Sequence, residues 1–218
     1  MSSVQGEIQA FEEKMGLPKD FYMSLLSEGD WSFLIKLHAL FEAAASHILT
    51  IRLGNGRLEG PFSYLELSNK NYGKATLLKE LGAITGDQKK FIQALSELRN
   101  QLVHKIGNVA FSLDEHVERM NKDQLKSFAS KFGHTFDDPM SIQGQSVSRV
   151  KFVKENPKLA IWVTASDVLA CILVEETFAE VEKAKRELLE RQAHMSTKIF
   201  ESLSLFKSTV QTENEPNR

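Results

Sequence analysis

The stretch Leu98-Arg99-Asn100-Gln101-Leu102-Val103-His104 ends a strongly patterned helix. Apolar side chains recur along this helix at steps of four, three and four residues, the spacing of one helical face: Phe91, Leu95, Leu98 and Leu102. Arg99, Asn100 and His104 lie off this apolar face. At about 100° per residue, the Arg99 and His104 side chains leave the helix about 140° apart, an arc that a flexible arginine can cover. One helix therefore presents a cation, an amide and an imidazole near its C-terminal end.

Length and composition predict an all-α protein with one main domain. The chain has 218 residues, of which 42% are hydrophobic, and it contains 5 prolines and few alternating β-branched runs. Four helices are expected to pack as an antiparallel bundle, over residues 30–53, 72–81, 87–106 and 157–190. The expected domains are an N-terminal helical arm (1–28), the bundle (30–193, with a less regular excursion at 108–142), and a helix end with a disordered tail (194–218).

Capping signals place several helix boundaries. Asp30 is the expected N-cap of the first long helix, Thr85 contributes to the cap of the motif helix, and Ser112 begins a short helix. Gly107 is expected to end the motif helix, which puts His104 in its last turn, where backbone carbonyls favour a protonated imidazole. Residues 143–155 are expected to be helical, and Pro157 begins the long closing helix.

The closing helix changes character after its apolar first half. Apolar residues between Val174 and Phe206 follow a loose seven-residue rhythm, which Lys185 and Gln192 interrupt. Charges alternate in sign over residues 175–191, as is typical of a solvated helix face. Such a segment can pair with another copy of itself or with the N-terminal arm.

Charge and cysteine content narrow the classes of function. The net charge of −2 provides no global basic field, so any contact with RNA must be local. The single cysteine, Cys171, cannot form an internal disulfide and fits a reducing cytosol. No secretory signal or membrane-spanning run is recognisable, so a cytoplasmic protein without a membrane partner is expected. His134, Asp137 and Asp138 fall in a loop where such side chains are usually solvated, so no metal or other cofactor is expected.

A histidine, an arginine and an orienting amide meet the needs of metal-free RNA cleavage. An imidazole titrates near neutral pH and can take or give a proton, while a guanidinium stabilises the charge that builds on phosphate oxygens. One histidine cannot perform both proton transfers at once, but a two-fold dimer would bring two copies of the motif together. Glu42, on the first long helix, is a candidate partner for Arg99, whereas His38 on the same helix is expected to be structural.

The motif and its context resemble the HEPN superfamily of helical proteins. Residues 98–104 match its Arg-x4–6-His signature, in which a polar residue, often asparagine, follows the arginine. Residues 72–84, Tyr-Gly-Lys-Ala-Thr-Leu-Leu-Lys-Glu-Leu-Gly-Ala-Ile, resemble the turn before the motif helix in the mannitol operon repressor-like branch. That branch usually has alanine where this chain has Val103. The resemblance covers residues 30–107 and, loosely, the closing helix.

The resemblance implies a dimeric helical bundle and, in active members, a metal-independent endoribonuclease that leaves cyclic phosphate ends. Arg99 and His104 would be catalytic and Asn100 their orienting neighbour. Such enzymes often serve as toxins, with an antitoxin partner, or as phage-defence effectors. The mannitol repressor-like branch instead implies a non-catalytic regulator or protein-interaction module. Nucleotide binding without cleavage is a third possibility, and helix-end arginines and histidines also occur for their favourable interaction with the helix dipole alone.

Overall fold

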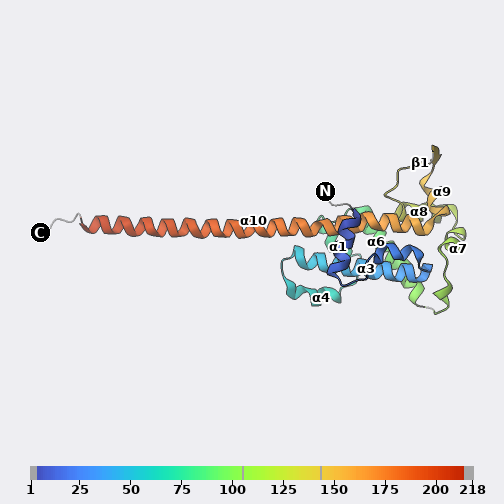
Figure 1. Ribbon diagram of the computed structural model, residues 1–218, viewed down its shortest axis with the longest axis horizontal. Coiled ribbons are helices and arrows are strands. Elements are labelled where there is room, and N and C mark those ends of the chain that lie inside the picture. Colours follow the sequence, from blue (N-terminus) through green and yellow to red (C-terminus); the bar gives the residue numbers. More distant parts are fainter. Residues whose placement is uncertain (1–3, 105, 143, 214–218) are drawn as a thin grey trace. The chain divides into compact units, whose positions relative to one another are not determined.

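The computed structural model describes the backbone of residues 4–104, 106–142 and 144–213, and within these ranges the side chains of residues 5–201 except residue 106. The fold is all-α, as predicted (Figure 1). The α-helices are α1 (Val4–Lys14), α2 (Phe21–Ser24), α3 (Asp30–Arg52), α4 (Glu59–Ser63), α5 (Lys74–Glu80), α6 (Gly86–Val103), α7 (Leu113–Glu118), α8 (Lys122–Phe132), α9 (Arg149–Glu155) and α10 (Pro157–Glu213). Short 3₁₀ turns occupy Leu25–Ser27, Gly56–Leu58 and Ile106–Ala110.

The chain divides into two compact units, residues 1–176 and residues 177–218. In the first unit, α3 packs against α5 and α6, while α8 packs against α6 and α9. Aromatic rings connect these layers: Phe91 of α6 contacts Phe41 of α3 at 5.5 Å between ring centroids and Phe132 of α8 at 5.6 Å. The apolar face predicted for the motif helix is therefore the one that reaches the core, since Phe91, Leu95, Leu98 and Leu102 are all buried.

The N-terminal arm belongs to the first unit. Ile8 and Phe11 of α1 are buried in its core. The Glu12 carboxylate is also buried and accepts a hydrogen bond from the backbone N–H of Tyr22, 2.7 Å away. Because the apolar and polar groups of α1 are used in this way, the arm is held against its own unit.

The capping residues act largely as the sequence predicts. Thr85 and Gln88 form a reciprocal capping box at the start of α6, and Ser112 caps α7. The Gln88 amide also donates to the Sγ atom of Cys171, 3.1 Å away, and so joins α6 to α10 within the first unit.

The prediction that Asp30 is the N-cap of the first long helix is wrong, because Gly29 takes that position. Asp30 lies in the first turn, and its carboxylate is committed to tertiary contacts. One oxygen accepts from the backbone N–H of Leu113 and the other pairs with Lys158, each at 2.8 Å. A negative charge in the first turn is still favourable to the helix dipole.

The prediction of a helix over residues 143–155 is wrong in its first part. Strands β1 (Met140–Ile142) and β2 (Gln145–Val147) form an antiparallel hairpin, and α9 begins only at Arg149. Gly144 has φ +78°, which favours the turn over a helix. Residue 143 lies outside the described residues. At the other end of the chain, α10 continues to Glu213, and the rest of the predicted disordered tail lies outside the described range.

Two helices, Asp30–Arg52 and Pro157–Glu201, are long and apolar enough to cross a membrane by length and composition alone. Half of the most apolar stretch in each is buried inside the protein, and core helices of soluble proteins have the same length and composition. The finding is therefore weak evidence for a membrane span.

Candidate functional site

Arg99 and Asn100 line a polar pocket of about 240 Å³ in the first unit. The Arg99 side chain is half-buried, and its Nη1 atom donates to the Asn100 side-chain oxygen, 3.0 Å away. The other lining residues come from α3, α6 and the segment before α5: His38, Glu42, Glu66, Leu67, Ser68 and Ser96. Two of the three predicted site residues thus share one cavity with a histidine that the sequence did not single out for chemistry.

His38 has a defined orientation in this pocket. Its side chain is buried, with 7% of the residue exposed, and Nε2 lies 3.1 Å from the Ser96 hydroxyl oxygen. The same hydroxyl lies 3.0 Å from the Ile92 carbonyl, and when it donates its proton there it accepts from His38 Nε2–H. The Nδ1 atom then carries the lone pair, and it lies 3.9 Å from the Glu42 carboxylate.

The surroundings of His38 favour its neutral form. Burial lowers the pKa of His38 and is the largest effect, because a charged imidazole loses its hydration. The Glu42 carboxylate acts in the opposite direction, and the positive charges of Arg99 and Lys74 lower the pKa further. A neutral imidazole with a lone pair beside a guanidinium is an arrangement suited to taking a proton near bound phosphate.

Lys74 supplies a buried positive charge next to the pocket. It is 1% exposed, and its Nζ atom lies 3.4 Å from Glu42 Oε1. The Glu42 carboxylate therefore pairs with Lys74, and it also faces His38. The predicted pairing of Glu42 with Arg99 is wrong, because α5 brings a closer cation to the carboxylate.

A close backbone approach fixes the start of α5. Gly73 packs against Asn69 so tightly that a Cβ atom there would lie 2.5 Å from the Asn69 backbone nitrogen. The Lys74 backbone N–H donates to the Glu66 carbonyl at 3.0 Å, which closes the loop over residues 66–74. Glycine at position 73 thus allows the loop that lines the pocket to return to α5.

The guanidinium of Arg99 is not used in an ion pair with another described residue. Within the described ranges no carboxylate lies within ion-pair distance of its guanidinium, and its hydrogen-bond partner is the neutral side chain of Asn100. Because Lys74 pairs with Glu42, the positive charge of Arg99 can attract an anionic group into the pocket, against the negative charge of Glu66, which also lines it.

His104 lies outside this pocket. It is the C-cap residue of α6 and is exposed to solvent. The amide of Asn108 donates to the Gln101 carbonyl at 2.8 Å and so satisfies a backbone group at the same helix end. Within one chain the structure brings Arg99 together with His38, and leaves His104 on the surface beyond the end of the helix.

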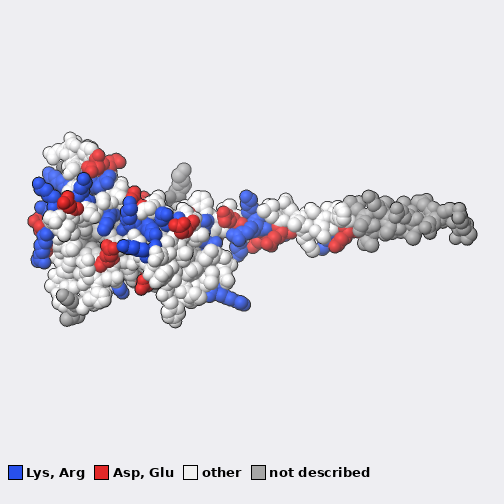
Figure 2. Space-filling model, turned by 180° about the vertical axis from the view of Figure 1, so that it is seen from behind, with Lys and Arg blue, Asp and Glu red and all other residues white. Residues whose placement is uncertain are grey.

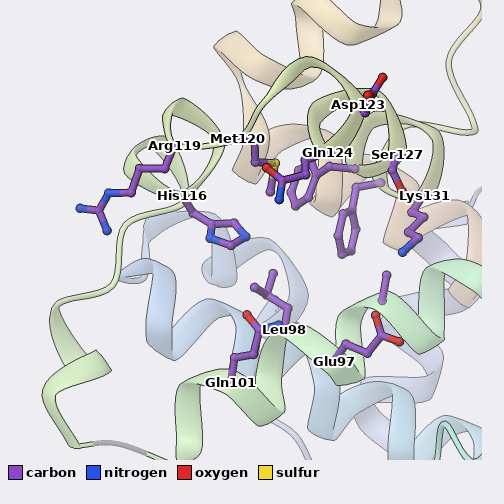
Figure 3. A pocket seen from close by; sticks show the side chains of 13 residues that line it. Glu97, Leu98, Gln101, His116, Arg119, Met120, Asp123, Gln124, Ser127 and Lys131 are labelled. Carbon is purple, nitrogen blue, oxygen red and sulfur yellow. The ribbon is translucent and has the colours of Figure 1, made fainter.

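A larger groove of about 620 Å³ lies between α6 and the α7–α8 segment (Figure 3). Leu98 and Met120 contribute apolar surface, while Glu97 and Lys131 are among its charged lining residues. His116 points into this groove, and burial lowers its pKa. The charges around the groove are of both signs, and none of the predicted site residues lines it.

Basic side chains gather on one face of the first unit, over the end that carries α8 and α9 (Figure 2). Acidic side chains lie among them. The exposed lysines of these two helices include Lys122 and Lys126 of α8 and Lys151 and Lys154 of α9, of which Lys151 pairs with Glu155 and Lys154 with Glu118.

The sequence contained a signal for the pocket, because His38 and Glu42 are spaced by four residues and therefore share one face of α3. Ser96 and Lys74 could be added to it only from tertiary structure. Comparisons of the chain with protein-family models, curated proteins and solved structures found no match.

Proposed function

We propose that this protein is a metal-independent endoribonuclease of the HEPN type, acting as a homodimer. The observation that best supports this function is the pocket that Arg99, Asn100 and His38 share. It combines a guanidinium without a carboxylate partner among the described residues with a neutral, oriented imidazole. Its volume of about 240 Å³ equals that of roughly eight water molecules, enough for a phosphate group and part of a ribose.

The proposed reaction is an internal transesterification of RNA. The Nδ1 atom of His38 accepts the proton of the ribose 2′-hydroxyl, and the 2′-oxygen forms a bond to phosphorus. Arg99, oriented by Asn100, stabilises the negative charge that builds on the phosphate oxygens. The bond from phosphorus to the 5′-oxygen breaks, and a protonated His104 gives its proton to this leaving oxygen. The products are a 2′,3′-cyclic phosphate and a free 5′-hydroxyl.

The dimer is part of the proposal because Arg99 and His104 diverge along α6. Their side chains leave the helix about 140° apart, and His104 is exposed while Arg99 faces the pocket. In a composite site, the second copy's His104 would approach the pocket of the first. The exposed lysines of α8 and α9 would contribute sequence-independent attraction for the RNA backbone.

The test is cleavage of varied RNA substrates in the presence of EDTA, with analysis of the product ends. Arg99→Ala and His104→Ala are each expected to reduce cleavage to a small residual rate while leaving the circular dichroism spectrum unchanged. Arg119→Ala and His194→Ala are matched controls, because both side chains are exposed and lie outside the pocket. Intact RNA after prolonged incubation with the wild-type chain would contradict the proposal.

A non-catalytic regulator or protein-interaction module is the second candidate function. It is favoured by the large apolar side chains that α10 exposes in the second unit, among them Phe178, Leu188 and Ile199. In this case the chain would form a stoichiometric complex with a regulatory protein or an antitoxin, and the complex would be unchanged in His104→Ala. Nuclease activity that depends on Arg99 and His104 would argue against a purely non-catalytic role.

A further inference from the structure

The second unit presents an uncovered apolar stripe. Its described backbone is one continuous helix, residues 177–213 of α10, which at 1.5 Å per residue is roughly 55 Å long. Five large apolar side chains on it are each 55–62% exposed: Phe178, Val181, Leu188, Met195 and Ile199. Most helices in proteins gain their stability by burying such a stripe, so this one requires a partner.

The stripe has the spacing of a coiled-coil seam. A coiled coil repeats every seven residues and buries the first and fourth positions of each repeat, called a and d. Here the a positions are Phe178, Lys185, Gln192 and Ile199, and the d positions are Val181, Leu188 and Met195. A seven-residue repeat drifts slowly around a straight helix, and two helices that follow it wind around each other with a left-handed twist. The required partner is therefore another helix with a matching repeat.

The N-terminal arm is unsuited to be that partner. Ile8 and Phe11, the buried apolar residues of α1, lie in the core of the first unit, and covering the stripe would expose them. An anionic membrane surface is also a poor match. Residues 180–191 carry acidic and basic side chains in equal number on the helix, whereas helices that bind such surfaces are rich in lysine and arginine.

We infer that residues 178–199 of α10 pair with the same residues of a second copy, as a parallel two-stranded coiled coil. A second copy carries the same repeat, so its a and d residues meet those of the first copy. The polar a residues Lys185 and Gln192 fix the number and alignment of the helices. In a parallel pair in register, the two Gln192 amides hydrogen-bond to each other. The two Lys185 stems lie along the seam while their ammonium groups reach water. An antiparallel pair would instead place both polar residues against apolar d residues.

The inference does not rest on RNA cleavage, but it names a contact that would hold the proposed homodimer together, and it is tested on the full chain by its mass in solution. Light scattering over a concentration series is expected to give twice the mass of one chain for the wild type. The double variant Leu188→Glu/Met195→Glu is expected to shift the population to monomers, because four carboxylates would then meet in the seam. The matched control is Ala193→Glu/Thr197→Glu, which adds the same charge on the outer face of the same turns and is expected to stay dimeric.

A monomeric wild type, or a dimer that persists unchanged in the Leu188→Glu/Met195→Glu variant, would overturn the inference. Strand direction is tested by Gln192→Cys under mild oxidation, with the wild-type chain, whose sole cysteine is Cys171, as control. A parallel pair in register places the two introduced thiols opposite each other and gives a covalent dimer. Failure of the variant to cross-link while its mass stays dimeric would overturn the parallel arrangement.

Discussion

The imidazole of His38 on α3 is anchored to the hydroxyl of Ser96 on α6, with 3.1 Å between Nε2 and Oγ. This contact fixes the side of the ring that faces the pocket, because the Ser96 hydroxyl is itself committed to the Ile92 carbonyl.

The free energy of unfolding is expected to decrease at acidic pH because of His38. Its pKa in the folded protein lies below the ordinary value of 6.5, chiefly because of burial, so the unfolded chain binds more protons between these two pKa values. The contribution of neutral, buried His38 to stability is therefore complete above pH 6.5. It is lost as the pH falls from 6.5 to the lower pKa of the folded protein. Thermal unfolding from pH 7 to pH 5 should show this loss. The loss should be smaller in His38→Gln, and His116, whose pKa is also lowered by burial, accounts for part of the remainder.

Ser96→Ala is expected to reduce RNA cleavage through the orientation of His38. The ring would lose its anchor at Nε2 and could adopt the other tautomer, in which the lone pair points away from the pocket. We expect a decrease of roughly 10- to 100-fold in kcat with a smaller change in KM, which is less than the roughly 10²- to 10⁴-fold typical for complete loss of general-base catalysis, because His38 itself is retained. Ser46→Ala is a suitable control, since Ser46 is also on α3 but lies outside the pocket and its hydroxyl donates to the Glu42 carbonyl. Unchanged kcat in Ser96→Ala would argue against His38 as the proton acceptor.

Arg99→Ala is expected to lower the rate of RNA cleavage and also to change how this rate rises with pH on the acidic side. The positive charge of Arg99 lowers the pKa of His38, so its removal raises that pKa and shifts residual activity to higher pH. Arg99→Lys keeps the charge but loses the bidentate geometry. It should therefore lower the rate without the same shift. Stability should change by less than about 1 kcal/mol in both variants, as measured by urea denaturation.

The two members of the Lys74–Glu42 pair are expected to differ in their effect on stability. Glu42→Gln leaves a buried ammonium group without its carboxylate, and should lower the free energy of unfolding by about 1–3 kcal/mol, less than for a fully buried pair because Glu42 is partly exposed. Lys74→Met removes the buried charge itself and should change stability by less than about 1.5 kcal/mol. Urea denaturation of both variants checks this order, and a larger loss in Lys74→Met would contradict it.

Gly73→Ala is expected to disturb the loop over the pocket. The added methyl would meet the Asn69 backbone at 2.5 Å, which the loop can relieve only by moving. The expected loss of stability is about 1–3 kcal/mol. Gly56→Ala is the control, since a Cβ atom there meets nothing within 4 Å. Equal melting temperatures for the wild type and Gly73→Ala would contradict the tight packing at this position.

Much of the fold follows from local pattern. The spacing of Phe91, Leu95 and Leu98 identifies the buried face of α6, because a helix repeats its faces every three to four residues wherever it packs. Thr85 and Ser112 mark helix starts because their side chains satisfy free backbone N–H groups locally. These features require no knowledge of distant parts of the chain.

The composition of the pocket depends on contacts that local pattern does not encode. A lone histidine such as His38 is usually structural, and its neighbours Ser96 and Lys74 lie 58 and 36 residues away in sequence. The choice of Asp30 as an N-cap failed for the same reason, since its carboxylate is used by Leu113 and Lys158 from other parts of the fold. Arg99 and Asn100 could be singled out because both lie within a single short motif.

The contact between Gln88 and Cys171 gives the chain a practical property. Burial raises the pKa of the Cys171 thiol, the Gln88 hydrogen bond opposes this, and the carboxylates of Asp167 and Glu175 raise it again. Little reactive thiolate is therefore present at neutral pH. Maleimide dyes should label cysteines placed at exposed positions well before they reach the native one, so distance measurements by fluorescence transfer are feasible without first removing Cys171.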